Sequence, residues 1–207
     1  MTLGLFPLNL VLFPHVRVPL HIFEPRYKEL MNECLERGSE FGINLVEEGH
    51  MHPIGCAARV VEVTQSYPDG RMDVIVEGTR RFRLLELKNN DRPFATGEIE
   101  GLDDDDVTLD QLLLNECLEK YNLIVTLVYG ATAPLLTHTD LGVCPSFDMA
   151  PKSGLSTEQK QSLIELSSEN QRLEELHEHF TELLPMIRRA EAIQRVVQSD
   201  GYLRAIT

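Results

Sequence analysis

Residues 19–38, PLHIFEPRYKELMNECLERG, mark the point where a strand gives way to a helix. Pro25 follows Glu24, and proline is favoured at the first position of a helix because its φ is fixed near the helical value and its missing N–H would have had no partner. Gly38 stands where a glycine commonly ends a helix. The spacing therefore predicts a helix from Pro25 to just before Gly38. Its expected buried stripe is Tyr27, Leu30, Met31, Cys34 and Leu35.

Short apolar and alternating segments around this helix predict strands. Residues 54–67 and 72–78 flank the sequence PDGR, whose Asp-Gly pair supplies the positive φ of a tight turn, so we expect a hairpin. The alternation in 79–87 predicts a further strand with Arg81 and Arg83 on its outer face. The other strand candidates are 6–20, 40–46 and 94–102. One helix among short, mostly hairpin-connected strands predicts a small, partly closed barrel.

The hydrophobic period changes after the four aspartates at 103–106. Residues 108–130 predict a helix that stops at Gly130. Residues 131–154 are rich in Pro, Thr and Gly, which predicts an irregular connection with a short helical turn. The second half of the chain is therefore expected to be helical.

Two amphipathic helices are predicted near the end of the chain. Ser156 and Gln159 have the spacing of a capping box, which indicates a helix start. In 168–198, apolar residues alternate at spacings of three and four, and Pro185 either kinks this helix or starts a new one. The apolar stripe consists of Leu173, Leu176, Phe180, Leu183, Ile187 and Ala190. We therefore expect an α+β protein with a β-rich domain over 1–101 and a helical bundle domain over 107–207.

Composition is that of an ordinary globular protein: 207 residues, 43% hydrophobic and 25% charged. Nowhere do about 20 consecutive apolar residues occur, so no membrane segment is expected. The cysteines are far apart and form no C-x-x-C pair, which favours reduced, buried thiols and a cytoplasmic location. They are Cys34, Cys56, Cys117 and Cys144.

The net charge of −14 is unevenly distributed, since residues 101–207 hold 8 basic and 18 acidic side chains, a net charge of −10. Such a field repels phosphate backbones, so nucleic acid is an unfavoured partner. The one basic cluster is RRFR at 80–83. An RNA-binding function, through Arg80, Arg81 and Arg83, therefore stays open as an alternative.

Motifs of nucleotide chemistry are absent from the sequence. It contains no Gly-Lys dipeptide and no G-x-G-x-x-G, so neither a nucleotide cofactor nor a catalytic residue is expected. His50, His52 and Cys56 could supply metal ligands, but their spacing matches no established zinc pattern, so we expect no metal. A small metal-assisted hydrolase built on these three residues is the remaining alternative from another class.

Three blocks, 6–30, 53–87 and 172–189, resemble in order and spacing the N-terminal substrate-binding domain of Lon proteases, especially its stand-alone form. The resemblance implies a PUA-like pseudo-barrel followed by a helical domain. In full-length Lon proteases an ATPase module and a Ser-Lys peptidase module follow this domain. Neither is found before Thr207, so we expect no enzymatic activity.

The resemblance implies a non-catalytic module that binds proteins or peptides, acting as an adaptor or a sensor of unfolded polypeptide. A surface that reads unfolded chains must expose apolar side chains. We expect this surface in the first domain, near loop or strand ends; the oligomeric state and the partner's identity stay open. The candidate binding residues are Phe13, His15, Phe23, Glu24 and Arg26.

Overall fold

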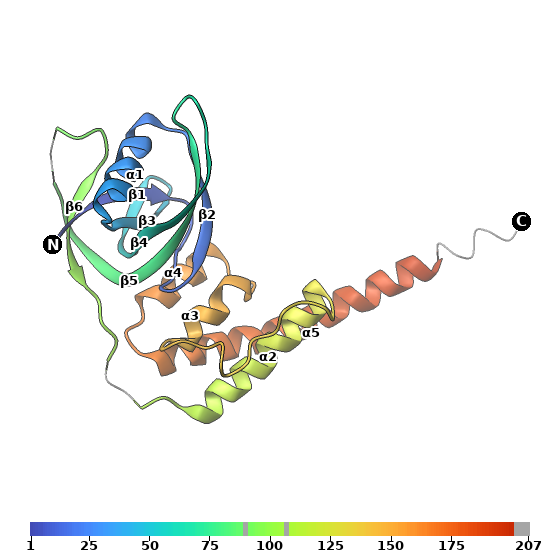
Figure 1. The fold of residues 1–207 in the computed structure, drawn as a ribbon. Coiled ribbons are helices and arrows are strands. Elements are labelled where there is room, and N and C mark those ends of the chain that lie inside the picture. The colour runs from blue at the N-terminus through green and yellow to red at the C-terminus, as the bar shows by residue number, and fades with distance from the viewer. Residues whose placement is uncertain (89–90, 106–107, 201–207) are drawn as a thin grey trace, which may run out of the picture. The chain divides into compact units, whose positions relative to one another are not determined.

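The computed structural model describes residues 1–88, 91–105 and 108–200. The chain forms two compact units, one of Met1–Asp106 with Ser156–Ser168 and the other of Val107–Leu155 with Glu169–Thr207 (Figure 1). The chain thus returns to its first unit after leaving it. The division expected from the sequence did not anticipate this return.

The first unit contains a six-stranded sheet in the order β2-β5-β4-β3-β1-β6, with a further pairing of β5 with β6. That pairing joins β1, β3, β4, β5 and β6 in a closed ring, and β2 lies outside it as a neighbour of β5. Among the six strands of the described residues, only β1 and β3 pair in parallel. The predicted pseudo-barrel is therefore confirmed. The strands are β1 Thr2–Leu8, β2 Arg17–Ile22, β3 Phe41–Glu47, β4 His50–Ser66, β5 Met72–Lys88 and β6 Thr96–Gly101.

Strand β5 closes the ring because it is long enough to pair with β4 and with β6. It also pairs with β2, which lies outside the ring. The sequence predicted two strands, 72–78 and 79–87, where the structure has one. Gly78, in the middle of β5, is needed because the chain passes very close there: a Cβ on Gly78 would lie 2.2 Å from the carbonyl oxygen of Phe13. The barrel core includes Leu3, Leu5, Ala57, Phe82 and Ile99.

Helix α1, Pro25–Arg37, lies between β2 and β3 in the chain, in the connection from β1 to its parallel partner β3. It begins and ends where the sequence predicts. Gly38 adopts the left-handed conformation, with φ of 61°. The expected stripe is buried except for Leu35, which is 41% exposed. Leu35 lies about 80° around the helix from Tyr27 and so at the edge of the buried face.

Helix α4, Thr157–Glu165, belongs to the first unit. The capping box of Ser156 and Gln159 forms as predicted. On the barrel side, the Gln161 Nε2 atom donates a hydrogen bond to the carbonyl oxygen of Ile54 at 3.0 Å. A polar side chain thus helps fix this helix against β4.

The second unit is built on two helices, α2 Gln111–Tyr129 and α5 Glu169–Asp200, which pack along each other (Figure 1). The Asp110 side chain caps α2, and Gly130 ends it as predicted. The short helices α3, Pro145–Met149, and η1, Ala150–Lys152, lie in the segment expected to be irregular.

Helix α5 continues through Pro185 without a new start. Its predicted stripe is buried at Leu173, Leu176 and Phe180 but exposed by Ala190. Figure 1 shows the later part of α5 extending beyond α2, which explains why burial fades along the stripe. Among the described helices, none combines the length and the apolar character needed to cross a membrane.

Candidate partner-binding surface

An exposed aromatic residue occupies the junction between β2 and α1. Phe23 is 58% exposed, and its ring stacks on the ring of His21 with centroids 5.9 Å apart and planes 22° apart. Alternation along β2 explains the placement, because Ile22 points into the core and its neighbours point outward. The junction therefore presents an apolar ring to solvent at the end of a strand.

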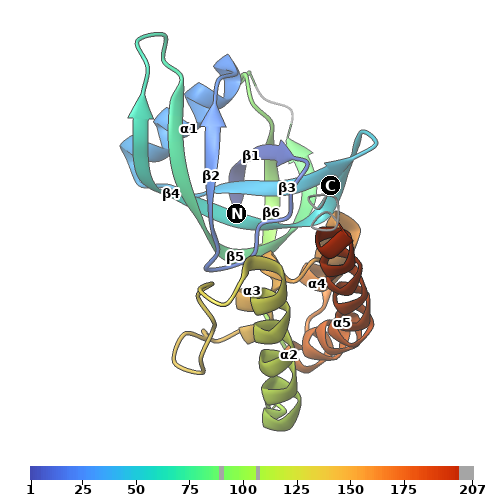
Figure 2. The ribbon, with the colours of Figure 1, turned by 90° about the vertical axis from the view of Figure 1, so that its right-hand side faces the viewer.

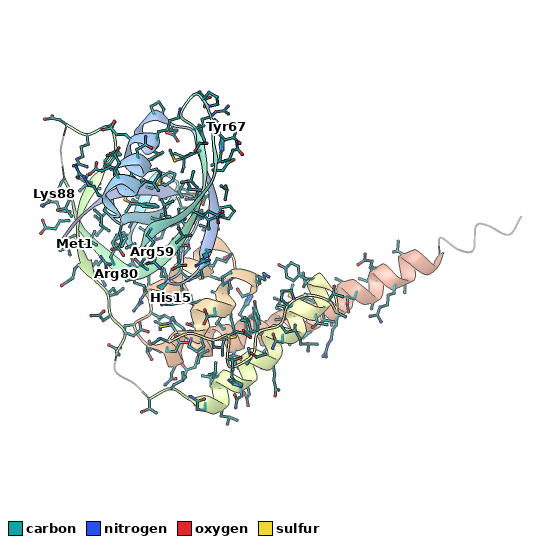
Figure 3. All side chains as sticks on the ribbon, in the orientation of Figure 1. Met1, His15, Arg59, Tyr67, Arg80 and Lys88 are labelled. Carbon is teal, nitrogen blue, oxygen red and sulfur yellow. The ribbon has the colours of Figure 1, made fainter. Side chains whose placement is uncertain are left out.

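A second aromatic residue joins from the β4–β5 turn. Tyr67 meets His21 edge to face at 6.0 Å between centroids, and the Arg71 guanidinium lies 5.0 Å above the Tyr67 ring. Figure 3 shows Tyr67 at this end of the hairpin. We call His21, Phe23 and Tyr67 the aromatic cluster.

Asp73 in β5 fixes the orientation of the aromatic cluster. The Tyr67 hydroxyl donates to one Asp73 oxygen at 2.8 Å, and the His21 Nδ1 atom lies 2.5 Å from the other. The contacts from His21 and Tyr67 hold the pKa of Asp73 below its ordinary value, and the bond to Asp73 raises the pKa of Tyr67. Both rings are thus positioned before any partner arrives.

Glu24 and Arg26 border the aromatic cluster at the start of α1. They form an ion pair at 2.7 Å, and the Arg26 guanidinium lies 4.6 Å from the centre of the Tyr27 ring. The structure therefore brings Phe23, Glu24 and Arg26 together. Sequence reasoning missed His21 and Tyr67, although the alternation of β2 and the position of a tyrosine before a turn were available signals.

The other two candidates lie apart from the aromatic cluster. Phe13 is only 2% exposed and packs in the core, so a partner cannot reach it in this structure. His15 is exposed, has a φ of 65°, and donates its backbone N–H to the carbonyl oxygen of Gly78 at 2.8 Å. It precedes β2, whereas Phe23 follows that strand, and Figure 3 shows His15 far from Tyr67.

The basic cluster is divided by the fold. Arg81 points away from the barrel core, on the outer strand face that alternation predicts. It is nevertheless only 4% exposed, so the expectation that it could reach a partner is wrong. The carbonyl oxygens of Ile164 and Leu166 and the carboxylate of Asp104 surround its guanidinium. Arg80 is paired with Glu40 at 2.5 Å and stays exposed, as does Arg83. The RNA-binding alternative thus loses its central arginine.

The three possible metal ligands do not form a site. Cys56 is buried in the barrel, and burial raises the pKa of its thiol to about 12. His50 is exposed at the start of β4, and the His52 Nδ1 atom lies 3.6 Å from the Glu165 carboxylate. The buried thiol is therefore unsuited to act with the two histidines.

Open strand edges near the cluster are protected against pairing with another strand. Within the described residues β2 pairs only with β5, as Figure 2 shows, so its other edge is open. The Gly78 N–H donates to the Val16 carbonyl, so the backbone groups of Val16 face β5. Backbone groups alternate between the two edges of a strand, so the nitrogen of Pro19, three residues later, faces the open edge. Proline has no N–H, so it offers no hydrogen-bond donor there. The outer part of β4 has two bulges. Such features discourage the addition of another strand at these edges.

The first unit is thus a closed pseudo-barrel that carries the aromatic cluster. The chain matches the family of ATP-dependent protease La (LON) substrate-binding domains over residues 2–182 and belongs to that family. Two curated relatives are Lon protease 1 of Hydrogenovibrio crunogenus, 26% identical over 81% of this chain, and Lon protease of Parabacteroides distasonis, 37% identical over 50%. The chain spans only 22% and 13% of their lengths.

Solved structures of two Lon N-terminal domains share the fold. A Lon N-terminal domain protein from Xanthomonas campestris is 29% identical with a TM-score of 0.63, over 85% of this chain and 96% of its own. The N-terminal domain of a Mycobacterium avium complex Lon protease has a TM-score of 0.64 at 15% identity, over 87% of this chain and 98% of its own. At that identity the second match shows the fold alone.

Proposed function

We propose that the protein binds segments of unfolded polypeptide and that the aromatic cluster is the contact surface. The observation that carries the proposal is Phe23, a large apolar ring exposed at the end of a strand in a chain of the Lon substrate-binding family. Aromatic side chains supply much contact area at low entropic cost, and they dominate many binding surfaces. The Asp73 contacts support this role because they hold the neighbouring rings in place.

We further propose that binding occurs without catalysis, in an adaptor or sensor role in the cytoplasm. The family match is to a substrate-binding domain, and the sequence has no phosphate-binding loop. Buried thiols at Cys34, Cys56 and Cys117 suit a reducing compartment. The purified protein should neither hydrolyse ATP nor cleave casein. Turnover that persists through several columns and disappears in a point variant would contradict this.

The test of the binding surface compares two exposed apolar residues. Phe23→Ser should weaken binding of a denatured model protein severalfold, while Leu85→Ser is the matched control, because Leu85 is 56% exposed on β5 outside the aromatic cluster. We expect micromolar affinity, roughly −8 kcal/mol, with little loss as salt is raised, because apolar contacts are not screened. Equal effects of the two substitutions would exclude the aromatic cluster as the contact surface.

Single-stranded RNA is the second ligand in the same titration. RNA binding that falls steeply with salt, and that Arg80→Gln with Arg83→Gln weakens, would favour the RNA-binding alternative. The exposed guanidiniums of these two arginines are the observation behind that alternative. Tight RNA binding without binding of denatured protein would overturn our proposal.

A further inference from the structure

A second feature of the first unit is a cleft of about 460 Å³ between the start of β1, the second half of α1 and residues 92–96. Leu3, Leu30 and Phe94 are apolar residues of its lining, and all three are largely buried. Gly4 allows this arrangement, because a Cβ there would lie 2.4 Å from the Leu30 Cδ1 atom. The volume lies in the usual range of small-ligand sites, about 300–1,000 Å³, and is more than enough for a terminal residue.

Charged side chains surround the mouth of the cleft. Arg37 and Arg92 each place an Nη1 atom 2.6 Å from a different oxygen of the Glu33 carboxylate. Lys88 also lines the cleft, with its Nζ atom 2.9 Å from Glu98. Each of the three cationic side chains is more than two-fifths exposed, so a ligand can reach them.

The lining contains more cations than carboxylates. Its cationic side chains are Arg37, Lys88 and Arg92, and its carboxylates are Glu33 and Glu40. Glu33 is bound by two of these arginines, and Glu40 is bound by Arg80. Lys88 is bound to Glu98, so with all partners counted the group holds four cationic side chains and three carboxylates. In a chain of net charge −14, this local excess of one positive charge favours an anion.

We propose that the cleft binds the C-terminal residue of a polypeptide. The α-carboxylate would contact Arg37, Arg92 and Lys88, and the side chain would lie over Leu30 and Phe94. A C-terminal residue carries a carboxylate and an apolar side chain on the same carbon, whereas an internal residue offers only one of the two. The inference takes its substrate class, polypeptide, from the proposed function, but it uses a different site.

The first unit supplies a matched control for this charge arrangement. Arg17 and Arg59 also share one carboxylate, that of Glu77, at 2.6 and 2.7 Å. These residues come from neighbouring strands of the sheet and do not line the cleft. The two groups therefore have the same pairing of charges, and only the first lines the cleft.

The test uses a fluorescent hexapeptide ending in leucine, as the free acid and as the C-terminal amide, titrated with the full chain by anisotropy. The amide should bind roughly fivefold to tenfold more weakly than the acid. The Arg37→Gln, Arg92→Gln double variant should remove this difference, while Arg17→Gln with Arg59→Gln should preserve it. Melting curves of both variants check that each is folded.

Equal binding of acid and amide would overturn the inference, as would equal loss in the two double variants, which would indicate non-specific attraction. Denatured protein with blocked ends, tested on Phe23→Ser, reports on the aromatic cluster separately. Preference for the acid peptide without binding of blocked denatured protein would support the cleft and contradict the aromatic cluster. Binding of blocked denatured protein without a preference for the acid peptide would support the aromatic cluster and contradict the cleft.

Discussion

The Arg81 Nη1 atom in β5 donates a hydrogen bond to the carbonyl oxygen of Ile164, at the end of α4, at 2.8 Å. The last carbonyls of a helix have no partner within the helix, and a cation at that end also suits the helix dipole. Arg81 therefore caps the C-terminal end of α4 and, by the same contact, anchors this helix to the barrel. An arginine that resembled a nucleic-acid contact in the sequence is a structural residue in the fold.

Arg81→Met should lower the free energy of unfolding by about 2 to 4 kcal/mol, because buried carbonyls and the Asp104 carboxylate lose their donor. The control is Arg83→Met, two residues along the same strand and exposed, with an expected change within about 0.5 kcal/mol. Urea denaturation followed by circular dichroism measures both. Similar small losses would show that Arg81 does not fasten α4.

Leu30→Ala, on the buried stripe of α1, should cost about 2 to 5 kcal/mol through lost burial and the cavity that remains. Leu35→Ala, on the same helix but partly exposed, should cost less than about 1 kcal/mol. Pro25→Ala should have a modest effect because proline at the first helical position acts through chain entropy. Denaturant melts compare the three. A larger loss at Leu35 than at Leu30 would contradict the orientation of α1.

The helical unit depends on a buried arginine. Arg172 is completely buried, its Nη2 atom lies 2.7 Å from Glu169, and its Nε atom donates to the Ser146 hydroxyl at 3.0 Å. Arg172→Met should cost about 3 to 5 kcal/mol, because it leaves the largely buried Glu169 carboxylate without its cationic partner.

Replacing both charged residues tests whether the stability lost in Arg172→Met comes from leaving the Glu169 carboxylate unpaired. Glu169→Met together with Arg172→Met should be less destabilising than the sum of the single changes, because no unpaired charge stays buried. Unfolding free energies of the four proteins give the coupling directly. Additive losses would mean that the two side chains act independently.

Acid stability should depend in part on Glu77. Hydrogen bonds from Arg17 and then Arg59 hold the pKa of Glu77 below its ordinary value, so the folded protein keeps this carboxylate ionised to lower pH than the unfolded chain does. The resulting stabilisation is present above the unfolded pKa of about 4.3 and is lost as pH falls through the folded pKa. Glu77→Gln should therefore reduce the fall in Tm between pH 7 and pH 3.

The same flattening should appear in the Arg17→Gln, Arg59→Gln double variant, because it removes both donors. At pH 7 the loss from Glu77→Gln should be at most about 1 kcal/mol, as for other pairs with exposed arginines. Thermal melts across the pH range measure both effects. Parallel curves for all three proteins would show that Glu77 contributes nothing to acid stability.

Expectations that depended on near neighbours in the chain agree with the structure. Pro25 and Gly38 bound α1, and Ser156 with Gln159 starts α4. The hairpin forms at the Asp-Gly turn, with strands on both sides. Expectations that depended on distant contacts were less complete: β5 is one strand where two were expected, and Leu35 and Arg81 differ in burial from the sequence pattern.

The sequence by itself determined the change from strands to helices, both ends of α1, the end of α2 at Gly130 and the start of α4. Caps, turns and periodicity are interactions among residues a few positions apart, so a local pattern is enough to specify them. Tertiary structure alone decided the closing of the barrel through β5 and the return of α4 to the first unit. It also assembled the aromatic cluster, in which Tyr67 reaches a ring of β2 across the intervening strand. The physical reason is that strand register and the covering of one element by another depend on contacts between distant residues, which no local pattern encodes.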